Sequence, residues 1–344
     1  MIVLIKQTLL CLLVFSSVLS AANTEVYYPF DGRKDCRVLG APFDTIPSPK
    51  DTSSAAIEGL AERMNINPAE ISKTAREDIF NKGYFSIYDV LLWACAKKNI
   101  KLQYHFDENL KTNVIDDLNG SKDWWYSVKY DGGGFEEPAH RMDTHPYKNK
   151  MAIRFYRVSP ERTKELCAVF KEEVDCLKIN SGRVILEEVS IRSAGQRLNF
   201  MDVEVKPHRV RGEMFKPDVL TAADIVYSLA ETGKLTFDNV WVDEINNISV
   251  KGYFFTRFNG EEGKGKAGFF HTLALGNTLK HGKKGFGDYT FHITADTRVI
   301  VSPKSLEWKW VNFGKSGDEF EIFTASGKPK PRKSRKDSGE ESYE

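Results

Sequence analysis

Residues 131–150 hold the densest set of side chains that could bind a metal ion. His140, Asp143 and His145 follow one another at spacings of three and two residues. Imidazole and carboxylate groups are ligands that zinc and similar ions accept, so a metal-dependent hydrolase is one hypothesis. The spacing matches no established ligand pattern, and polar side chains are common in loops. We therefore favour an ordinary loop over a metal site in this segment.

A literal G-x-G-x-x-G pattern occurs at Gly263, Gly265 and Gly268. In dinucleotide-binding proteins a helix begins at this pattern, so that its N-terminus can face a pyrophosphate. Here the sequence FFHTLAL follows, which is typical of a strand, and a glycine-rich hairpin tip is favoured. The sequence also contains no nucleophile elbow and no HExxH signature. We expect a protein that is not an enzyme.

Two adjacent tryptophans occur in the stretch DLNGSKDWWYSV, directly after an Asn-Gly pair. Alternation along a strand places Trp124 and Tyr126 on an apolar face, which predicts that Trp124 lies in the core. The opposite face carries Trp125 with Ser127, so a large ring lies among polar residues. Such a ring suits a ring-bearing ligand, a sugar or a protein partner. The alternative is that the following loop, or a second copy of the unit described below, covers Trp125.

The elements that would position these residues recur along the chain. FSIYDVLLWACAKKN, from residue 85, matches LTAADIVYSLAETGK, from residue 220. Ser86 precedes Asp89 as Thr221 precedes Asp224, which is the spacing of a capping box at a helix start. Apolar residues then follow at helical spacing. Each copy is expected to contain one short amphipathic helix.

A hairpin signature and a closing strand follow each helix. Asn119–Gly120 and Asn259–Gly260 can supply the positive φ angles of a tight turn, and two adjacent aromatic residues come after each. MAIRFYRV, from residue 151, and LEWKWVNF, from residue 306, are expected to be the final strands. The repeat unit is therefore strands, one helix, a hairpin and a last strand. The candidate ligand contacts from the two aromatic pairs are Trp125, Tyr126, Ser127, Phe270 and His271.

This succession resembles the β-grasp-type domain at the C-terminus of transcobalamin and intrinsic factor, which recurs in many exported bacterial proteins. The segments that carry the resemblance are SIYDVLLWA, LNG, WWYSV followed by Gly132, and IRFYR. It extends over residues 57–158 and, more loosely, over residues 187–313. The resemblance implies an α+β fold of two tandem β-grasp-like domains, each a small mixed sheet with one capped helix. Cobalamin is a ligand implied by the resemblance alone.

The sequence departs from that family in two respects. Where the family has a second Asn-Gly pair, this chain has Tyr130-Asp131-Gly132 in one copy and Leu275-Gly276-Asn277 in the other. It also lacks a long helical stretch that could form the α-barrel enclosing most of the cobalamin in the transport proteins. The resemblance therefore implies a fold and a small-molecule contact surface, without the rest of a corrinoid carrier.

The N-terminal residues have the composition of a secretory signal peptide. Lys6 precedes an apolar run at residues 9–19, and small residues follow up to Ala22. The run is shorter than the ~20 residues of a spanning helix, and no later segment is apolar enough to cross a bilayer. We expect an exported protein, periplasmic, cell-surface or extracellular, with no transmembrane segment in its mature chain. The expected divisions are a signal peptide at 1–22, an extended lead-in at 23–55, repeats at 56–160 and 185–323, an inter-domain segment at 161–184, and a disordered charged tail at 324–344.

Four cysteines would remain after removal of the signal peptide. An even number in an exported chain allows two disulfides, with three connectivities among Cys36, Cys95, Cys167 and Cys176. A Cys167–Cys176 bond is favoured because it would close a short loop between the repeats. Four buried free thiols are the alternative.

The sequence favours an exported, non-catalytic binding protein that uses aromatic strand faces and hairpin loops. Its partner would be a ring-bearing small molecule such as a corrinoid, a glycan or an envelope protein. A structural or adhesive envelope protein with the repeats as spacers is the alternative, and the metal-dependent hydrolase is a second. The 49 basic and 48 acidic residues nearly balance, which gives no reason to expect nucleic acid as a partner.

Overall fold

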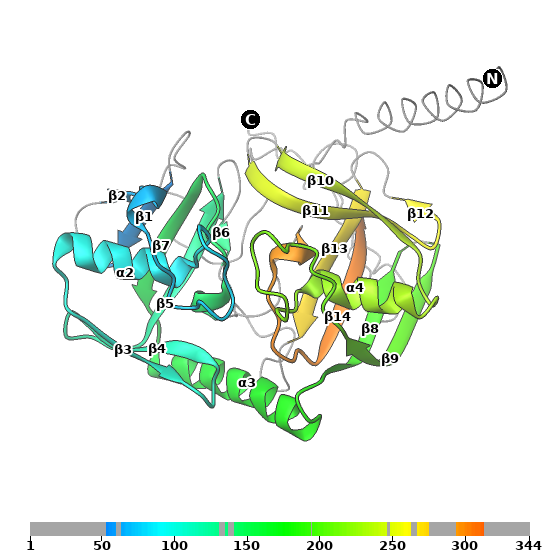
Figure 1. Cartoon of the computed structure of the whole chain (residues 1–344), viewed down its shortest axis with the longest axis horizontal. Helices are drawn as coiled ribbons and strands as arrows, with labels where there is room; N and C mark the ends of the chain where they lie inside the picture. The colour runs from blue at the N-terminus through cyan, green and yellow to red at the C-terminus, as the bar shows by residue number, and fades with distance from the viewer. Residues whose placement is uncertain are drawn as a thin grey trace, which may run out of the picture.

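The computed structural model describes residues 53–59, 63–130, 135–136, 141–193, 195–245, 248–262, 267–274 and 294–312. Over these ranges the chain is a mixed α+β protein with three α-helices and several small sheets (Figure 1). The expected α+β class is confirmed at this level. The predicted signal peptide, most of the lead-in and the charged tail lie outside the described residues. No helix in the described part of the chain is long and apolar enough to cross a membrane.

The first half is built on a five-stranded sheet in the order β2-β1-β7-β5-β6. At its centre β1 pairs in parallel with β7, and β7 pairs antiparallel with β5. The helix α2 (Ile87–Lys98) packs its apolar side against this sheet. The strands are β1 (Ser54–Ile57), β2 (Met64–Asn65), β5 (Trp124–Tyr130), β6 (Phe135–Glu136) and β7 (Met151–Arg157), with 3-10 turns η1 (Pro68–Glu70) and η2 (Met142–Thr144).

The second half repeats this arrangement in a four-stranded sheet in the order β13-β14-β8-β9. Here β14 pairs in parallel with β8 and antiparallel with β13. The helix α4 (Ala222–Glu231) contributes to its core as α2 does in the first half. The strands are β8 (Val184–Arg192), β9 (Arg197–Val205), β13 (Ala267–Ala274) and β14 (Ser305–Asn312), with the 3-10 turn η3 (Ala295–Thr297).

Each half also carries an antiparallel hairpin outside its main sheet. In the first half β3 (Leu102–Asp107) pairs with β4 (Thr112–Leu118). In the second half β10 (Phe237–Ile245) pairs with β11 (Ile248–Phe258), which β12 (Glu261–Glu262) extends. The two hairpins lie on opposite sides of the molecule, β3–β4 at the lower left and β10–β11 at the upper right of Figure 1.

Local signals in the sequence explain where the repeated elements begin and turn. The carboxylate of Asp89 accepts a hydrogen bond from the Ser86 backbone N–H at 2.7 Å, and a capping box begins α2. Asp224 accepts in the same way from Thr221 at 2.6 Å, before α4. Such caps contribute about 1 kcal/mol each. The predicted helix starts are therefore confirmed.

The predicted Asn-Gly turns are also confirmed. Asn119 and Gly120 have φ angles of 52° and 81°, and Asn259 and Gly260 have φ angles of 45° and 81°. A two-residue turn with both central residues at positive φ continues the right-handed twist of the strands, which is why this pair of residues is preferred there.

The two halves contact each other through equivalent residues. Phe80 and Phe215 form an isolated antiparallel bridge, and their ring centroids lie 5.6 Å apart. On one side the Asn81 N–H donates to the Met214 carbonyl at 2.9 Å, and on the other the Lys216 N–H donates to the Ile79 carbonyl at 2.9 Å. This reciprocal pattern is that of an isologous interface, here within one chain.

The helix α3 (Pro160–Ile179) occupies most of the segment that was expected to connect the repeats. It runs along the lower edge of the molecule, past both halves (Figure 1). Its residues Leu166, Val169 and Phe170 belong to the core cluster of the second half. Trp125 of the first half packs against the same cluster. The connecting segment is thus part of the folded core.

The predicted Cys167–Cys176 disulfide is wrong. Both residues lie on α3, where a nine-residue separation corresponds to roughly 13 Å, about twice the Cα separation that a disulfide allows. Cys95, Cys167 and Cys176 are free thiols, and Cys36 lies outside the described residues. Burial raises the pKa of Cys95 to about 11, so its thiol is a core side chain without nucleophilic character.

Phe80→Ala is expected to lower the free energy of unfolding by about 3–5 kcal/mol, because the ring is buried. Phe215→Ala should cost a similar amount. Since the two rings touch, the double variant should lose about 0.5–1.5 kcal/mol less than the sum, measured by urea denaturation. Phe80→Ala combined with Phe269→Ala, a buried ring in the second-half cluster, is the additive control. Additive losses for Phe80 and Phe215 would contradict the contact between the halves.

Candidate functional site

Trp125, the leading candidate from the sequence, lies between β5 and α3. Its ring centroid is 6.1 Å from that of Phe170 on α3, and the side chain packs against the core clusters of both halves. The expectation of an outward-facing ring is corrected by this packing. Its described cover includes α3, which was not among the alternatives, and the core cluster of the second half, which was. Trp124 is partly buried against the first core, and its Nε1–H donates to the Ser121 carbonyl at 3.0 Å.

Three of the other candidate ligand contacts from the aromatic pairs are buried. Tyr126 and Ser127 are fully buried in β5. His271 is fully buried in β13, with its ring 4.8 Å from that of Trp308. The backbone of Phe270 pairs with Lys309, and its side chain lies outside what the structure describes. Strand alternation identified residues that share a face, but Tyr126, Ser127 and His271 are buried on it.

The proposed metal ligands are engaged in other contacts. The Asp143 carboxylate accepts hydrogen bonds from Arg76, from the Thr112 hydroxyl at 2.7 Å and from the Asn113 backbone and side chain. His145 Nδ1 lies 3.1 Å from the Tyr126 hydroxyl. His140 lies outside the described residues. Among those that are described, no group of three or more His, Cys, Asp or Glu residues could hold a metal ion.

The glycine-rich segment precedes a strand, as predicted. Gly268 lies in β13 and pairs with Val311 of β14, so no helix begins at the end of the G-x-G-x-x-G pattern. Gly263 and Gly265 lie outside the described residues. Without a helix N-terminus at this point, the pattern lacks the anion-binding geometry of a dinucleotide site.

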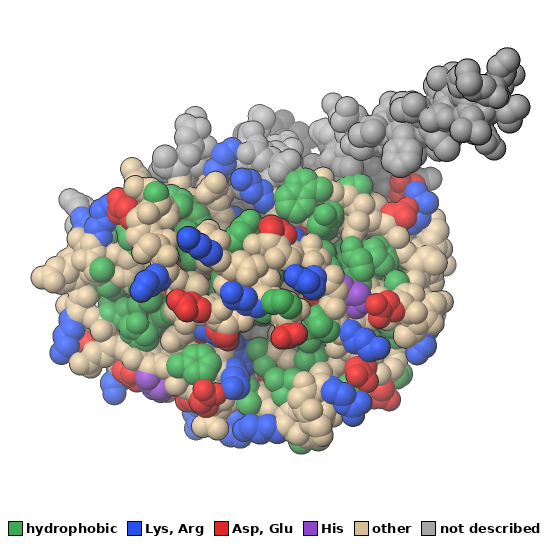
Figure 2. All heavy atoms as spheres, viewed as in Figure 1, with side chains coloured by type: hydrophobic (Ala, Val, Ile, Leu, Met, Phe, Trp, Pro, Cys, Tyr) green, Lys and Arg blue, Asp and Glu red, His purple; other side chains and the backbone are tan. Residues whose placement is uncertain are grey.

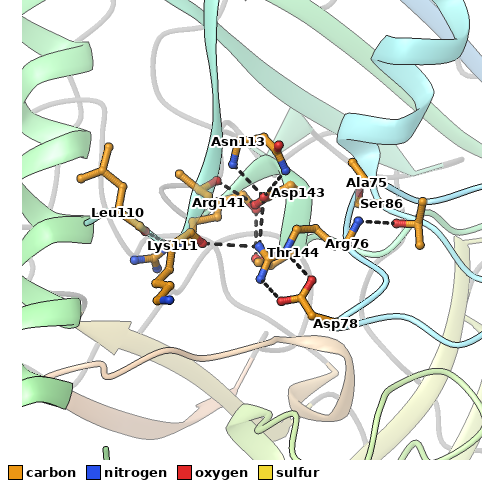
Figure 3. A network of polar contacts seen from close by, with 12 residues as sticks. Ala75, Arg76, Asp78, Ser86, Leu110, Lys111, Asn113, Arg141, Asp143 and Thr144 are labelled. Atoms are coloured by element: carbon orange, nitrogen blue, oxygen red, sulfur yellow. Dashed lines mark hydrogen bonds and ion pairs between the residues drawn. The ribbon is translucent and has the colours of Figure 1, made fainter. Parts of the chain in front are cut away.

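A buried arginine network lies at the centre of the first half. Figure 3 shows the Arg76 guanidinium between the carboxylates of Asp143, at 3.0 Å, and Asp78, at 2.8 Å. It also donates to the Lys111 carbonyl at the turn between β3 and β4. The ring of Phe106 on β3 lies 5.2 Å from the guanidinium carbon. One side chain therefore connects the segment before α2, the hairpin and η2.

The second half builds the same network from equivalent residues. Arg211 donates to Asp296 at 3.0 Å, to Glu213, and to the Lys251 carbonyl at 3.0 Å. Trp241 on β10 takes the place of Phe106, with its ring 5.0 Å from the Arg211 guanidinium carbon. The sequence offered one signal for this network, the constant offset of the two capped helices. Extended upstream and downstream, that offset aligns Arg76 with Arg211 and Phe106 with Trp241.

These rings remain accessible although they contact a buried cation. Phe106 is 38% exposed and Trp241 is 44% exposed. Tyr104, two residues before Phe106 on the same face of β3, is 45% exposed. Tyr253 lies opposite Trp241 on β11, with the ring centroids 5.2 Å apart. We call Tyr104 with Phe106 the first aromatic platform, and Trp241 with Tyr253 the second.

The platforms account for most of the exposed apolar side chains that the structure describes. Only five large apolar residues in the described ranges are exposed, and three of them lie on the two hairpins. On the face shown in Figure 2, a patch of apolar side chains lies over the β10–β11 hairpin, among charged groups. An exposed aromatic ring at the same place in both halves is the candidate functional site.

The halves differ at the residue that faces the buried carboxylate. Gly252 takes the place of Thr112, and a Cβ there would lie 2.6 Å from Thr294 Cγ2 and 2.8 Å from Asp296 Oδ1. Among the described residues Asp296 Oδ1 consequently has no hydrogen-bond partner, whereas Asp143 has the Thr112 hydroxyl. Burial raises the pKa of Asp296, and Arg211 offsets part of that effect.

A buried ion pair ties α3 to the first half. Arg141 pairs with Glu173 of α3, and its guanidinium carbon lies 4.4 Å from the Phe170 ring centroid. Burial raises the pKa of Glu173, while the positive charge of Arg141 acts in the opposite direction. Because Phe170 belongs to the second core, this pair helps to hold the two halves in one arrangement.

No protein-family model, no curated protein and no solved structure matches this chain. The site is therefore defined by its own geometry and by the internal repeat.

Replacing Arg211 with Met is expected to lower the free energy of unfolding by about 3–5 kcal/mol, because Asp296 would remain buried without its cation. Arg257→Met is the matched control, since that arginine pairs with Asp238 in a half-exposed position and should cost about 1 kcal/mol or less. Urea denaturation measures both. Equal losses in the two variants would show that the buried network contributes no more than a surface pair.

The stability should depend on pH through His145. Burial holds the pKa of His145 well below its ordinary value of 6.5, so the folded protein does not bind the proton that the unfolded chain binds. Stability should therefore fall as the pH drops below about 6.5, by up to about 1.4 kcal/mol per pH unit from this group. His145→Gln should flatten the slope between pH 6.5 and 5.

Tyr126→Phe is the control for that experiment, because it removes the hydrogen bond to His145 but keeps the imidazole. This variant should retain the slope of the wild-type protein. A His145→Gln variant with the wild-type slope would contradict the assignment.

Proposed function

We propose that this chain is an exported, non-catalytic binding protein of two tandem β-grasp-like units that contacts its partner through the two aromatic platforms. The shared strand order supports the β-grasp part of the proposal. In each half the last strand lies beside the first in parallel, and one capped helix contributes to the core. Export is proposed from the composition of residues 1–22, and it agrees with the resemblance drawn from the sequence.

The observation that carries the proposal is the aromatic ring stacked on a buried arginine at equivalent places in both halves. Packing alone does not require an exposed indole at Trp241 or an exposed phenyl ring at Phe106. The arginines have carboxylate and carbonyl partners of their own, so the rings are not needed to neutralise their charge. The rings are the part of each network that a partner can reach.

The arginine contact also prepares the rings for binding. A guanidinium stacked on an aromatic face contributes about 0.5–2 kcal/mol and limits the rotation of the ring. Arg76 and Arg211 are themselves fixed by carboxylates and a backbone carbonyl. A ring that is already ordered loses less conformational entropy on binding. The partner class is a ring-bearing small molecule, such as a corrinoid, a glycan, or an envelope protein.

Binding is tested with cobalamin, a set of soluble polysaccharides and purified envelope proteins, each titrated into the full mature chain. We expect saturable binding to at least one of them, weakened about tenfold or more when Phe106→Ala and Trp241→Ala are combined. Met201→Ala removes an exposed apolar side chain from β9, away from both hairpins, and should leave affinity within about twofold.

Two outcomes would contradict the proposal. Unchanged affinity and unchanged number of sites in the double variant would place the contact elsewhere. If none of the tested ligands bound at high micromolar protein, the alternative function would be favoured. In that alternative the units are spacers of a structural or adhesive envelope protein.

A further inference from the structure

The size of the platforms favours one of the three partner classes. Small-molecule sites enclose about 70–90% of their ligand, whereas an outward ring on a hairpin contacts a ligand from one side only. A stable protein interface needs about 800 Å² on each partner. The exposed part of Trp241 amounts to roughly 100 Å². A platform of two rings is therefore small for a protein and too open for a free small molecule such as a corrinoid.

The groups around the first platform are polar and accessible. Asp78 pairs with Arg76 beneath Phe106 at 2.8 Å, and its side chain is exposed. Lys111 pairs with Glu108 at the turn, and these side chains are also exposed. Both pairs offer hydrogen-bond donors and acceptors beside the rings.

The second platform has a comparable border. Glu213, which binds Arg211 beneath Trp241, has a side chain that is half exposed. Each platform thus combines a rigid aromatic surface with charged hydrogen-bonding groups.

This combination suits a sugar ring. A pyranose has faces of C–H groups, which can pack on an aromatic ring, and an edge of hydroxyl groups, which can donate to carboxylates and accept from guanidinium or ammonium groups. A sugar within a polymer needs contact from one side only, because its neighbours in the chain remain in solvent. The openness that excludes a free small molecule is therefore compatible with a polysaccharide.

Because the unit is duplicated, the chain has two platforms and therefore a valency of two. The platforms occupy equivalent positions in the two halves, and their hairpins lie on opposite sides of the molecule (Figure 1). The Phe80–Phe215 bridge and the Arg141–Glu173 pair hold the halves together. A repeating polymer presents the same unit many times, so both platforms can be occupied at once. Because the two hairpins lie on opposite sides of the molecule, each platform can hold a different polymer strand.

We propose that the chain binds a repeating carbohydrate polymer at both platforms and thereby cross-links two polymer strands. This inference rests on the proposed function, which assigns binding to the platforms, and adds the carbohydrate class and a valency of two. No covalent step is involved.

The test uses the full mature chain with soluble β-1,3-glucan, xylan and soluble peptidoglycan strands as separate probes. With a polymer that it binds, the wild-type protein should raise light scattering to a maximum at an intermediate protein-to-polymer ratio and reduce it at excess protein. Four-sugar fragments of the same polymer should bind without scattering and should reverse the scattering of the polymer mixture. Met201→Ala should behave as the wild-type protein does.

Single-platform variants separate valency from binding. Phe106→Ala and Trp241→Ala should each still bind the polymer, measured by calorimetry, at about half the wild-type number of sites and without the scattering maximum. The double variant should lose binding about a hundredfold or more. Circular dichroism and the urea midpoint of each variant establish that it is folded.

The outcomes distinguish the inference from the proposed function. Carbohydrate binding at one site per chain, without scattering, would overturn the cross-linking. Binding of cobalamin or an envelope protein that the platform variants weaken, with no carbohydrate bound, would overturn the carbohydrate class and leave the proposed function standing. Binding that neither variant changes would overturn both.

Discussion

Each half of the molecule contains one buried arginine that joins three segments distant in sequence. Arg76 joins the segment before α2, the β3–β4 turn and η2 through Asp78, the Lys111 carbonyl and Asp143. A buried charge requires an opposite charge and further hydrogen bonds, and the loss of one partner is strongly destabilising. This requirement positions the hairpin, which lies outside the main sheet and would otherwise be a marginal two-stranded element.

The two copies of this network have diverged in a way that couples the halves. With Gly252 in place of Thr112, one oxygen of the second carboxylate, Asp296, accepts no hydrogen bond from the part of the chain that the structure describes. Lys148 of the first half reaches Thr294, two residues before Asp296, at 3.2 Å. Its positive charge acts against the rise that burial causes in the pKa of Asp296. The first half thus supplies electrostatic support to the second, in addition to the reciprocal contact at Phe80 and Phe215.

The same arginines connect stability with the proposed binding surface. A guanidinium satisfied along its edge by carboxylates can still offer its flat face to an aromatic ring, because the edge donates hydrogen bonds and the face does not. Phe106 and Trp241 occupy that face and remain exposed on their hairpins. In each half the same arginine therefore stabilises the fold and supports the exposed ring. This is consistent with the duplication of both features together.

The sequence by itself determined the local elements: the capped starts of α2 and α4, the Asn-Gly turns and the closing strands, because short spacings encode local hydrogen bonds and turn angles. Only the tertiary structure decided what covers each face. Alternation grouped Trp125 with Ser127, but α3, whose Phe170 packs on Trp125, buries that face. The platforms could not be predicted from spacing either. Arg76 and Phe106 lie thirty residues apart in sequence, and Asp143, which pairs with Arg76, lies further along the chain. Which side chains are buried and which charges pair over such separations depends on tertiary packing, and short-range residue spacing does not encode that packing.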